Sequence, residues 1–588
     1  MRRTWFYALL SMAVVAAFVL TACGPAETPV AEEPVEEPTE APAEEPTEEP
    51  AEEPTEEPTE EPAAEPKIVT MTFFEEPDSL NTMYSGMWFA GLAIDIFNPG
   101  LWYFDDNLEP SLEMAAEFPT ADNGLISEDG TTITVPLREE AQWSDGEPVT
   151  ADDFIFTYEM ILDPANTVQS TWPYDEYVES VEASDDHTLV LNFTEPFAPW
   201  ATTIFQFVMP EHVLRPVFEE EGTLDNAAWN RTPEVVNGAF RVREWQSASH
   251  IIYEANDNYW RGRPVLDEIH ILIVPDAEAQ MAAIENGDTD IGIFLSYADV
   301  PVIEEMEDVE LTTVLSGYNE SWFFNLNTEE NAADAGHPAL QDVEVRQAIA
   351  YAVDFDAICE ELLYGKTYPP STKWEETPYD YPDANLYKYD PDMANQLLDE
   401  AGWVDSNDNG TRDKDGVELV LTYATTQGRE VREQTQVIAQ QYLQDVGIGI
   451  EIQNASYDVF WNSYGEGGPI ATGQFDIAQW SDSPDFPDPN EDQWLCSEIP
   501  TEEEPEGNNW YGICDEELDE MVRAQAVEVD PNRRIELFHD IGRILTDNVY
   551  WLGVWHDNDL WTRNMRTQNI KISGADPFWN CFEWDVSE

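Results

Sequence analysis

The sequence predicts a mixed α/β protein, and two observations carry that prediction. From Lys67 onward, segments with helical periodicity alternate with β-rich stretches such as Thr188–Phe193 and His270–Val274, and no long linker separates them. No repeat of fixed period occurs in this part of the chain, so a solenoid or propeller is not indicated. At 588 residues the chain has room for two or three domains with their own hydrophobic cores.

Residues 1–22 are expected to be a secretory signal. Arg2 and Arg3 precede an apolar run that ends at Leu20, and a short basic start before such a run is typical of export signals. The following Leu-Thr-Ala-Cys, residues 20–23, resembles a bacterial lipobox, which implies cleavage before Cys23 and lipidation of that residue. An ordinary signal peptide and a twin-arginine export signal are the alternatives.

Residues 23–66 are expected to form a disordered tether behind the lipidated Cys23. Pro recurs at every fourth position from Pro34 to Pro66 among Glu and Thr, and apolar periodicity is absent. Such a segment cannot bury a core, while Pro and like charges extend it. At about 3.1 Å per residue its upper reach is on the order of 130 Å.

The chain is strongly acidic, with a formal net charge of −97. Nucleic acids and anionic membrane surfaces would be repelled, so the charge argues against both as partners. Neutral or cationic ligands fit this charge. A general surface adaptation, for instance to high salt, explains the acid excess better than a ligand does.

Three helices have clear start signals. Thr150 can cap the first, Asp390 followed by Pro precedes the second, and Asp530 followed by Pro precedes the third. Gly402 is the expected end of the second helix. The expected apolar positions are Phe154, Ile155, Tyr158, Ile161 and Leu162 in the first helix, Leu397, Leu398 and Ala401 in the second, and Ile535, Phe538, Ile541 and Leu545 in the third.

Four regions of the sequence carry a family resemblance. They are LREEAQWSDGEPVTADDF at 137–154, the series NGAF, NYWRG and AAIENGDTDI at 237–240, 258–262 and 282–291, DVEVRQAIAYAVD at 342–354, and WSDSPDFPDP at 480–489. In this order they resemble the signature segments of family 5 extracellular solute-binding proteins, the receptors of oligopeptide, dipeptide and nickel ABC importers. The resemblance covers residues 67–588.

The resemblance implies a type II periplasmic-binding-protein architecture, in which two hinged α/β lobes carry an inserted third domain. The implied parts are lobe I (67–97, 234–322 and 553–588), the inserted domain II (98–233) and lobe III (323–552). The chain would cross between lobes I and III near Phe324–Asn325 and near Gly553. Two such crossings would form a hinge, and its closure would enclose the ligand.

The resemblance also implies the function, that of a membrane-tethered extracytoplasmic receptor delivering oligopeptides to an ABC importer. The same role for oligosaccharides is the first alternative, because the abundant Trp suits stacking on sugar rings. A secreted hydrolase or a surface adhesin is the second. The sequence contains no His-Glu-x-x-His, Gly-x-Ser-x-Gly or P-loop pattern. We therefore expect a monomeric binding protein, not an enzyme, without a cofactor, and with permease and ATPase subunits as partners.

Asp485 is the expected ligand-binding acid. In peptide-binding members of the family the acid of this segment pairs with the α-ammonium group of the ligand, and a charge-assisted hydrogen bond suits a closed cleft. A loop carboxylate satisfied by local backbone donors is the alternative. Core packing competes with ligand contact for each of the expected wall residues, which are Trp480, Phe486, Asn325, Trp322, Trp88, Tyr84 and Phe294.

Besides Cys23 the chain has four cysteines, and export permits disulfides. Cys496 and Cys514, which flank a loop rich in Gly, Pro and Glu, are the expected pair. The sequence leaves open whether Cys359 pairs with Cys581.

Residues 405–413 read DSNDNGTRD and have the oxygen spacing of a calcium loop. The candidate ligands are Asp405, Asn407, Asn409 and Asp413. Gly416 stands where an EF-hand has its bidentate Glu. A polar turn is therefore the better interpretation, and a structural calcium site is the alternative.

Overall fold

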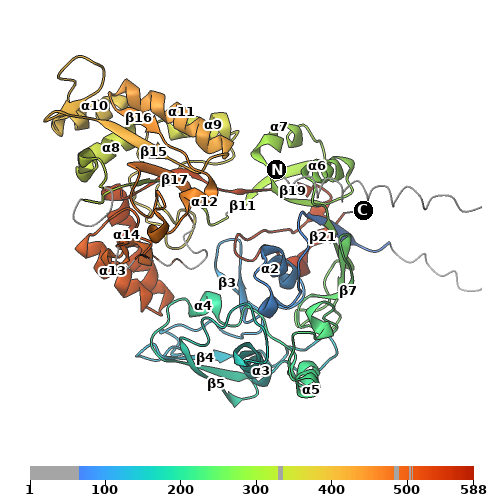
Figure 1. The fold of residues 1–588 in the computed structure, drawn as a ribbon. Coiled ribbons are helices and arrows are strands. Elements are labelled where there is room, and N and C mark those ends of the chain that lie inside the picture. Colours follow the sequence, from blue (N-terminus) through green and yellow to red (C-terminus); the bar gives the residue numbers. More distant parts are fainter. Residues whose placement is uncertain are drawn as a thin grey trace, which may run out of the picture. The chain divides into compact units, whose positions relative to one another are not determined.

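A seven-stranded and a five-stranded sheet carry most of the strands in the computed structural model (Figure 1). The structure describes residues 65–314, 316–328, 335–482, 489, 491–501, 505 and 507–587. Residues 65–588 form one compact unit. None of the helices in the described ranges is long and apolar enough to cross a lipid bilayer.

The seven-stranded sheet has the order β11-β19-β10-β1-β9-β8-β7. Its strands are β1 (Ile68–Phe73), β7 (Phe240–Gln246), β8 (His250–Ala255), β9 (Glu268–Ile273), β10 (Ile291–Leu295), β11 (Val309–Val314) and β19 (Asp559–Asn564). Strand β1 runs parallel to both β9 and β10, and helix α6 (Ala277–Asn286) connects those two neighbours. Asp276 caps α6 and Gly287, with φ of 73°, ends it, so the local sequence determines both ends of this crossover.

The five-stranded sheet has the order β16-β15-β17-β12-β18. Its strands are β12 (Asn319–Phe324), β15 (Val420–Ala424), β16 (Gly449–Ile452), β17 (Ile477–Asp482) and β18 (Trp551–His556). The longer helices of this region are α8 (Val343–Ala352), α9 (Phe355–Leu362), α10 (Pro391–Glu400), α11 (Glu430–Asp445), α13 (Glu516–Ala526) and α14 (Pro531–Asp547). Helix α11 contacts β16, whereas α9 and α14 contact β18.

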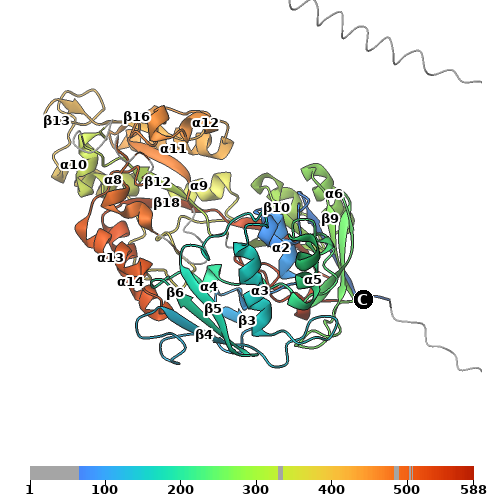
Figure 2. The ribbon, with the colours of Figure 1, turned by 60° about the horizontal axis from the view of Figure 1, so that its bottom comes forward.

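Residues 98–233 contain a separate three-stranded sheet, β4-β6-β5 (Figure 2). The elements of this region are β2 (Trp102–Phe104), β3 (Pro110–Leu112), β4 (Thr132–Pro136), α3 (Ala151–Leu162), β5 (Val178–Asp185), β6 (Thr188–Phe193), α4 (Trp200–Thr203) and α5 (Glu211–Glu221). Helix α3 packs against β5 and β6. The remaining α-helices and strands are α2 (Trp88–Asp95), α7 (Val300–Ile303), α12 (Tyr457–Phe460), β13 (Asp413–Lys414), β14 (Val417–Glu418), β20 (Thr567–Gln568) and β21 (Asp585–Val586).

The three helices predicted from their start signals are present as α3, α10 and α14. Thr150 and Asp153 form a capping box at the start of α3. Asp390 and Asp530 each accept a backbone hydrogen bond as the N-cap of a helix that begins with Pro. Short-range capping chemistry was therefore enough to predict where these helices begin.

The two chain crossings lie a few residues away from the predicted positions. Strands β12 and β18 pair with each other along their length, with Asn319 opposite His556, so both belong wholly to the five-stranded sheet. The chain leaves the seven-stranded sheet after Val314 and re-enters it at Asp559. The lobe boundaries expected between residues 322 and 323 and between residues 552 and 553 therefore fall inside strands β12 and β18. The division into two lobes and an inserted domain stays a prediction.

The two crossing segments are bonded to each other. The hydroxyl of Ser316 donates to the carbonyl oxygen of Asp557, and the amide of Asp557 donates to the carbonyl of Tyr318 at 2.9 Å. The phenol of Tyr297 donates to the carbonyl of Asn558 at 3.1 Å. The first two bonds hold the crossings side by side, and the third ties the second crossing to the segment after β10.

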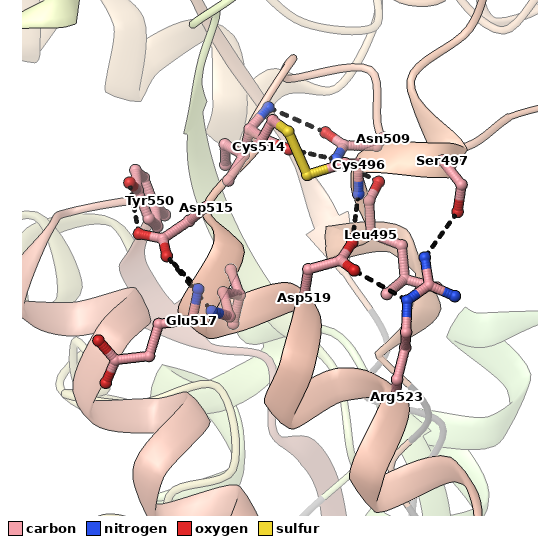
Figure 3. The surroundings of a disulfide bond; sticks show 12 residues. Leu495, Cys496, Ser497, Asn509, Cys514, Asp515, Glu517, Asp519, Arg523 and Tyr550 are labelled. Atoms are coloured by element: carbon pink, nitrogen blue, oxygen red, sulfur yellow. Dashed lines mark hydrogen bonds and ion pairs between the residues drawn. A yellow bond between two sulfur atoms is a disulfide. The ribbon is translucent and has the colours of Figure 1, made fainter.

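Cys496 and Cys514 form a disulfide, with Cα atoms 4.7 Å apart (Figure 3). The amide of Cys496 donates to Asp519, which also binds Arg523 at 2.8 Å. The disulfide thus ties its loop to the first turns of α13. Cys359 and Cys581 are separate buried thiols, because each packs in the hydrophobic core of a different sheet.

Candidate ligand-binding site

A cavity of about 690 Å³ lies among helix α2, strand β2 and the segments 199–207 and 574–577. This volume is within the range of small-molecule sites, on the order of 300–1,000 Å³. Ser316 and Tyr318, from one chain crossing, also line it. The cavity therefore adjoins the segments that connect the two large sheets.

One face of helix α2 forms a wall of the cavity. Trp88, Gly91, Leu92 and Asp95 line it, and their spacing of three and four residues places them on the same side of the helix. The opposite side buries Phe89 and Ala93 in the core of the seven-stranded sheet. Trp88 is 53% exposed and therefore available to a ligand.

The other walls are strongly aromatic. They are contributed by Trp102, Tyr103, Phe104, Trp172, Phe205 and Phe207. The indole nitrogen of Trp102 donates to the carbonyl of Ala201 at 2.8 Å, which fixes β2 against the 199–207 segment. At Gly100 a Cβ atom would lie 1.9 Å from the carbonyl oxygen of Phe205, so only Gly allows these two segments to approach this closely.

Two carboxyl groups, Asp95 and Asp576, line the same cavity. The amide of Phe104 donates to Asp576 at 2.6 Å, and the backbone of Phe578 hydrogen-bonds Asp95. Burial raises the pKa of Asp576 to about 7. Burial and the neighbouring Asp576 raise the pKa of Asp95 well above its ordinary value.

The predicted site residues that the structure describes fall into three groups. Trp88 lines the cavity, and Phe294 is half-buried with its ring centroid 6.3 Å from that of Trp88. Tyr84 packs against the core of the 98–233 region, with its hydroxyl 3.4 Å from Asn166. The third group consists of Trp322, Asn325 and Trp480, which are all buried.

Trp322, Asn325 and Trp480 lie in the core of the five-stranded sheet instead of on a cavity wall. The indole of Trp322 donates to the hydroxyl of Tyr423 at 2.7 Å, and the amide of Asn325 donates to two backbone carbonyls. Trp480 stacks on Phe323 with ring centroids 4.1 Å apart. These contacts satisfy the three side chains within the core, and their expected role as walls of a ligand site stays a prediction. Asp485 and Phe486 lie outside the described residues.

A buried ion cluster joins the end of β17 to the segment that follows residue 490. Lys373 Nζ lies 2.9 Å from Asp482 and 3.0 Å from Glu491. The indole of Trp494 also donates to Glu491. Burial raises the pKa of Glu491 to about 7, although Lys373 opposes that change. The cluster fixes the two backbone positions between which the sequence motif of Asp485 occurs.

The loop 405–413 uses its oxygens internally. Asp405 accepts from the amides of Asn409 and Gly410 at 3.1 and 2.9 Å, and Asn407 accepts from Asn409 at 3.0 Å. The hydroxyl of Ser406 donates a hydrogen bond to the carboxylate of Asp413 at 2.7 Å. These bonds are those of a polar turn. Among the residues that the structure describes, no group of three or more His, Cys, Asp or Glu side chains could hold a metal ion.

Sequence reasoning missed most of the cavity. The high Trp content signalled aromatic walls in general but not the positions of Trp102 and Trp172. Asp95 and Asp576 come from distant parts of the chain, and among so many carboxylates nothing marked this pair.

Comparisons with known proteins agree with this fold. The model of "Bacterial extracellular solute-binding proteins, family 5 Middle" matches residues 113–498. The oligopeptide-binding protein AppA of Bacillus subtilis is 26% identical over 527 residues, which cover 87% of this chain and 90% of that protein. The structure of AppA in complex with a nonapeptide has a TM-score of 0.56 at 22% identity and covers 89% of this chain and 100% of that one.

A nickel ABC transporter structure from Bacillus halodurans gives a TM-score of 0.72 at 18% identity, covering 88% of this chain and 100% of that one. These likenesses show the expected type II periplasmic-binding-protein fold. Because the family model spans more than half of the sequence, the chain belongs to family 5 of the bacterial extracellular solute-binding proteins.

Proposed function

We propose that this chain is the extracytoplasmic receptor of an ABC importer and captures oligopeptides. The observation that carries the proposal is the aromatic cavity of about 690 Å³ beside the chain crossings, in a member of a solute-binding family. The relative AppA, which is named an oligopeptide-binding protein, supports the ligand class.

The geometry suggests how capture works. The apolar walls favour displacement of water by ligand side chains, and backbone and polar groups at the cavity rim would orient the chain of a peptide. Rotation about the paired crossings at Ser316 and Asp557 would then enclose the ligand. Binding and release require no covalent step, so the permease would receive the peptide unchanged.

Export and lipidation of Cys23 are part of the proposal. The lipobox-like residues 20–23 support it. A Cys23→Ser variant should leave the membrane fraction of the producing cell and enter the soluble extracytoplasmic fraction. Retention of that variant in the membrane would contradict the lipid anchor.

The ligand class is tested by thermal shift of the exported protein with defined pentapeptide pools and with cello- and manno-oligosaccharides. A ligand that binds the native state raises the melting temperature with concentration, by mass action. Peptides should do so, whereas stabilisation by sugars alone would overturn the peptide assignment.

The role proposed for Asp485 is tested by an isosteric variant. Asp485→Asn should weaken peptide binding at least tenfold if its charge pairs with the α-ammonium group, because a charge-assisted hydrogen bond is lost. Asp488→Asn, three residues away in the same segment, is the matched control and should bind like wild type. Equal affinities of wild type and Asp485→Asn would remove the role.

A further inference from the structure

Three buried acids of this chain, unlike the half-buried carboxyl pair of the cavity, have a built-in cation. Glu113 is paired with Arg261 at 2.9 Å, Glu320 with Arg432 at 2.6 Å, and Asp290 with Arg566 at 2.6 Å. A buried carboxylate without a cation is costly, and these three have one built in.

Asp95 and Asp576 have no such partner. Among the described residues that line their cavity there is no Lys, Arg or His. The backbone bonds from Phe104 and Phe578 orient the two groups but supply no charge. Because the two acids line one cavity and interact electrostatically with each other, a single cation entering the cavity could reach both.

The cavity is also kept open on the side of α2. Gly91 stands inside this helix, where Gly is less favourable than Ala, and a Cβ atom there would find no neighbour within 4 Å. Packing therefore does not require a glycine at this position. Its effect is to leave room between Trp88 and Asp95 on the cavity face.

The aromatic walls suit a cation on an apolar stem. The rings of Trp88, Trp102, Tyr103 and Phe104 line the same cavity as the two carboxyl groups. Aromatic faces attract ammonium and guanidinium groups and also pack against methylene chains.

We propose that this cavity is a subsite for a cationic group on an aliphatic stem, the Lys or Arg side chain of a bound peptide, with Asp95 and Asp576 as its counter-ions. The identification of a peptide as the carrier rests on the proposed function. The cavity, the unpaired carboxyl groups and the open face at Gly91 do not depend on it.

The test compares pentapeptides that carry Arg at one position with peptides that carry citrulline, its neutral isostere, at that position. Titration calorimetry on the wild-type protein should show at least tenfold tighter binding of Arg than of citrulline at one or more positions. Asp95→Asn and Asp576→Asn should reduce that ratio below threefold. Asp122→Asn, an exposed acid in the 98–233 region, should leave it unchanged.

A further variant tests the space itself. Gly91→Phe should fill the cavity and weaken binding of the Arg peptide at least tenfold. Melting temperatures of all variants show whether each one folds. Equal binding of the Arg peptide by Gly91→Phe and wild type would overturn the placement of the subsite.

Agmatine, a guanidinium on an aliphatic stem, separates failure of the subsite from failure of the peptide proposal. Millimolar agmatine should raise the melting temperature of wild type but not of Asp95→Asn. That result without any peptide binding would support the subsite and contradict peptide capture. Equal affinity for Arg and citrulline peptides, with no effect of agmatine, would overturn the subsite while peptide capture stands. No response to peptides or agmatine would overturn both.

Discussion

The indole nitrogen of Trp200 donates a hydrogen bond to the carbonyl oxygen of Val529, 3.3 Å away, and so joins the 98–233 region to the segment that leads into α14. The side chain of Val529 is buried in the hydrophobic core of the 98–233 region. One residue later, Asp530 caps α14 and accepts the amide of Ala121 at 3.3 Å. A short segment before α14 is thus part of the packing of the 98–233 region.

The first prediction concerns the packing of the Val529 side chain in the core of the 98–233 region. Val529→Ala should lower the free energy of unfolding by about 1–2 kcal/mol, because two buried methyl groups are removed from the core of another region. Urea denaturation measures the loss. Val527→Ala, at a side chain that is 55% exposed, is the matched control and should change stability by less than about 0.5 kcal/mol. Equal effects of both variants would contradict the contact.

The second prediction concerns pH. Because burial raises the pKa of Asp576 to about 7, the native protein holds a proton that the unfolded chain releases near its ordinary pKa of 3.8. The native state then binds more protons between these values, so this group's contribution to stability falls as pH rises from about 4 to 7. The titratable groups in this environment are Asp95, Tyr103, Cys581 and Glu113. The pKa of Asp95 is raised like that of Asp576.

Asp576→Asn removes the ionisation. The free energy of unfolding of this variant should exceed that of wild type by on the order of 1–3 kcal/mol at pH 8, since one pKa unit corresponds to about 1.4 kcal/mol. The difference should shrink toward pH 5. Chemical denaturation at both pH values measures it, with Asp122→Asn as the control. A difference that stays constant with pH would contradict a buried ionisable group.

The third prediction concerns the buried ion cluster. Lys373→Met should destabilise the protein by about 3–5 kcal/mol, because Asp482 and Glu491 would be left buried without their cation. Lys388→Met, at a side chain that is 69% exposed and 3.9 Å from Asp356, should cost less than about 1 kcal/mol. If the double variant Lys373→Met/Glu491→Gln is no more stable than Lys373→Met, charge burial is not the cause.

The fourth prediction concerns the disulfide. Replacing Cys496 and Cys514 together by Ser should lower stability by about 3 kcal/mol, as expected for a closed loop of 18 residues. Urea denaturation under non-reducing conditions measures the loss. Thiol labelling of the unfolded, unreduced protein should modify Cys359 and Cys581 and spare the bonded pair. Labelling of Cys496 in wild type would contradict the pairing.

The parts of the fold that depend on local chemistry were predictable from the sequence. Thr150, Asp390 and Asp530 each place a capping oxygen before an apolar stripe, and each begins a helix. The chain crossings were misplaced because strand pairing, not local sequence, decides that β12 and β18 share a sheet.

The candidate site was less predictable, for two physical reasons. An aromatic residue such as Trp322 looks the same in sequence whether it packs in a core or faces a ligand, and here its hydrogen bond to Tyr423 belongs to the core. Asp95 and Asp576 approach each other only because α2 and the 574–577 segment meet in the folded chain. Such a meeting leaves no periodicity and no motif for sequence reasoning to find.

The bonded crossings at Ser316 and Asp557 also limit how the two large sheets can move. Two backbone segments that hydrogen-bond side by side behave as a ribbon, which flexes readily across its plane but resists shear and independent twisting. A rotation of one sheet against the other must therefore bend both segments together.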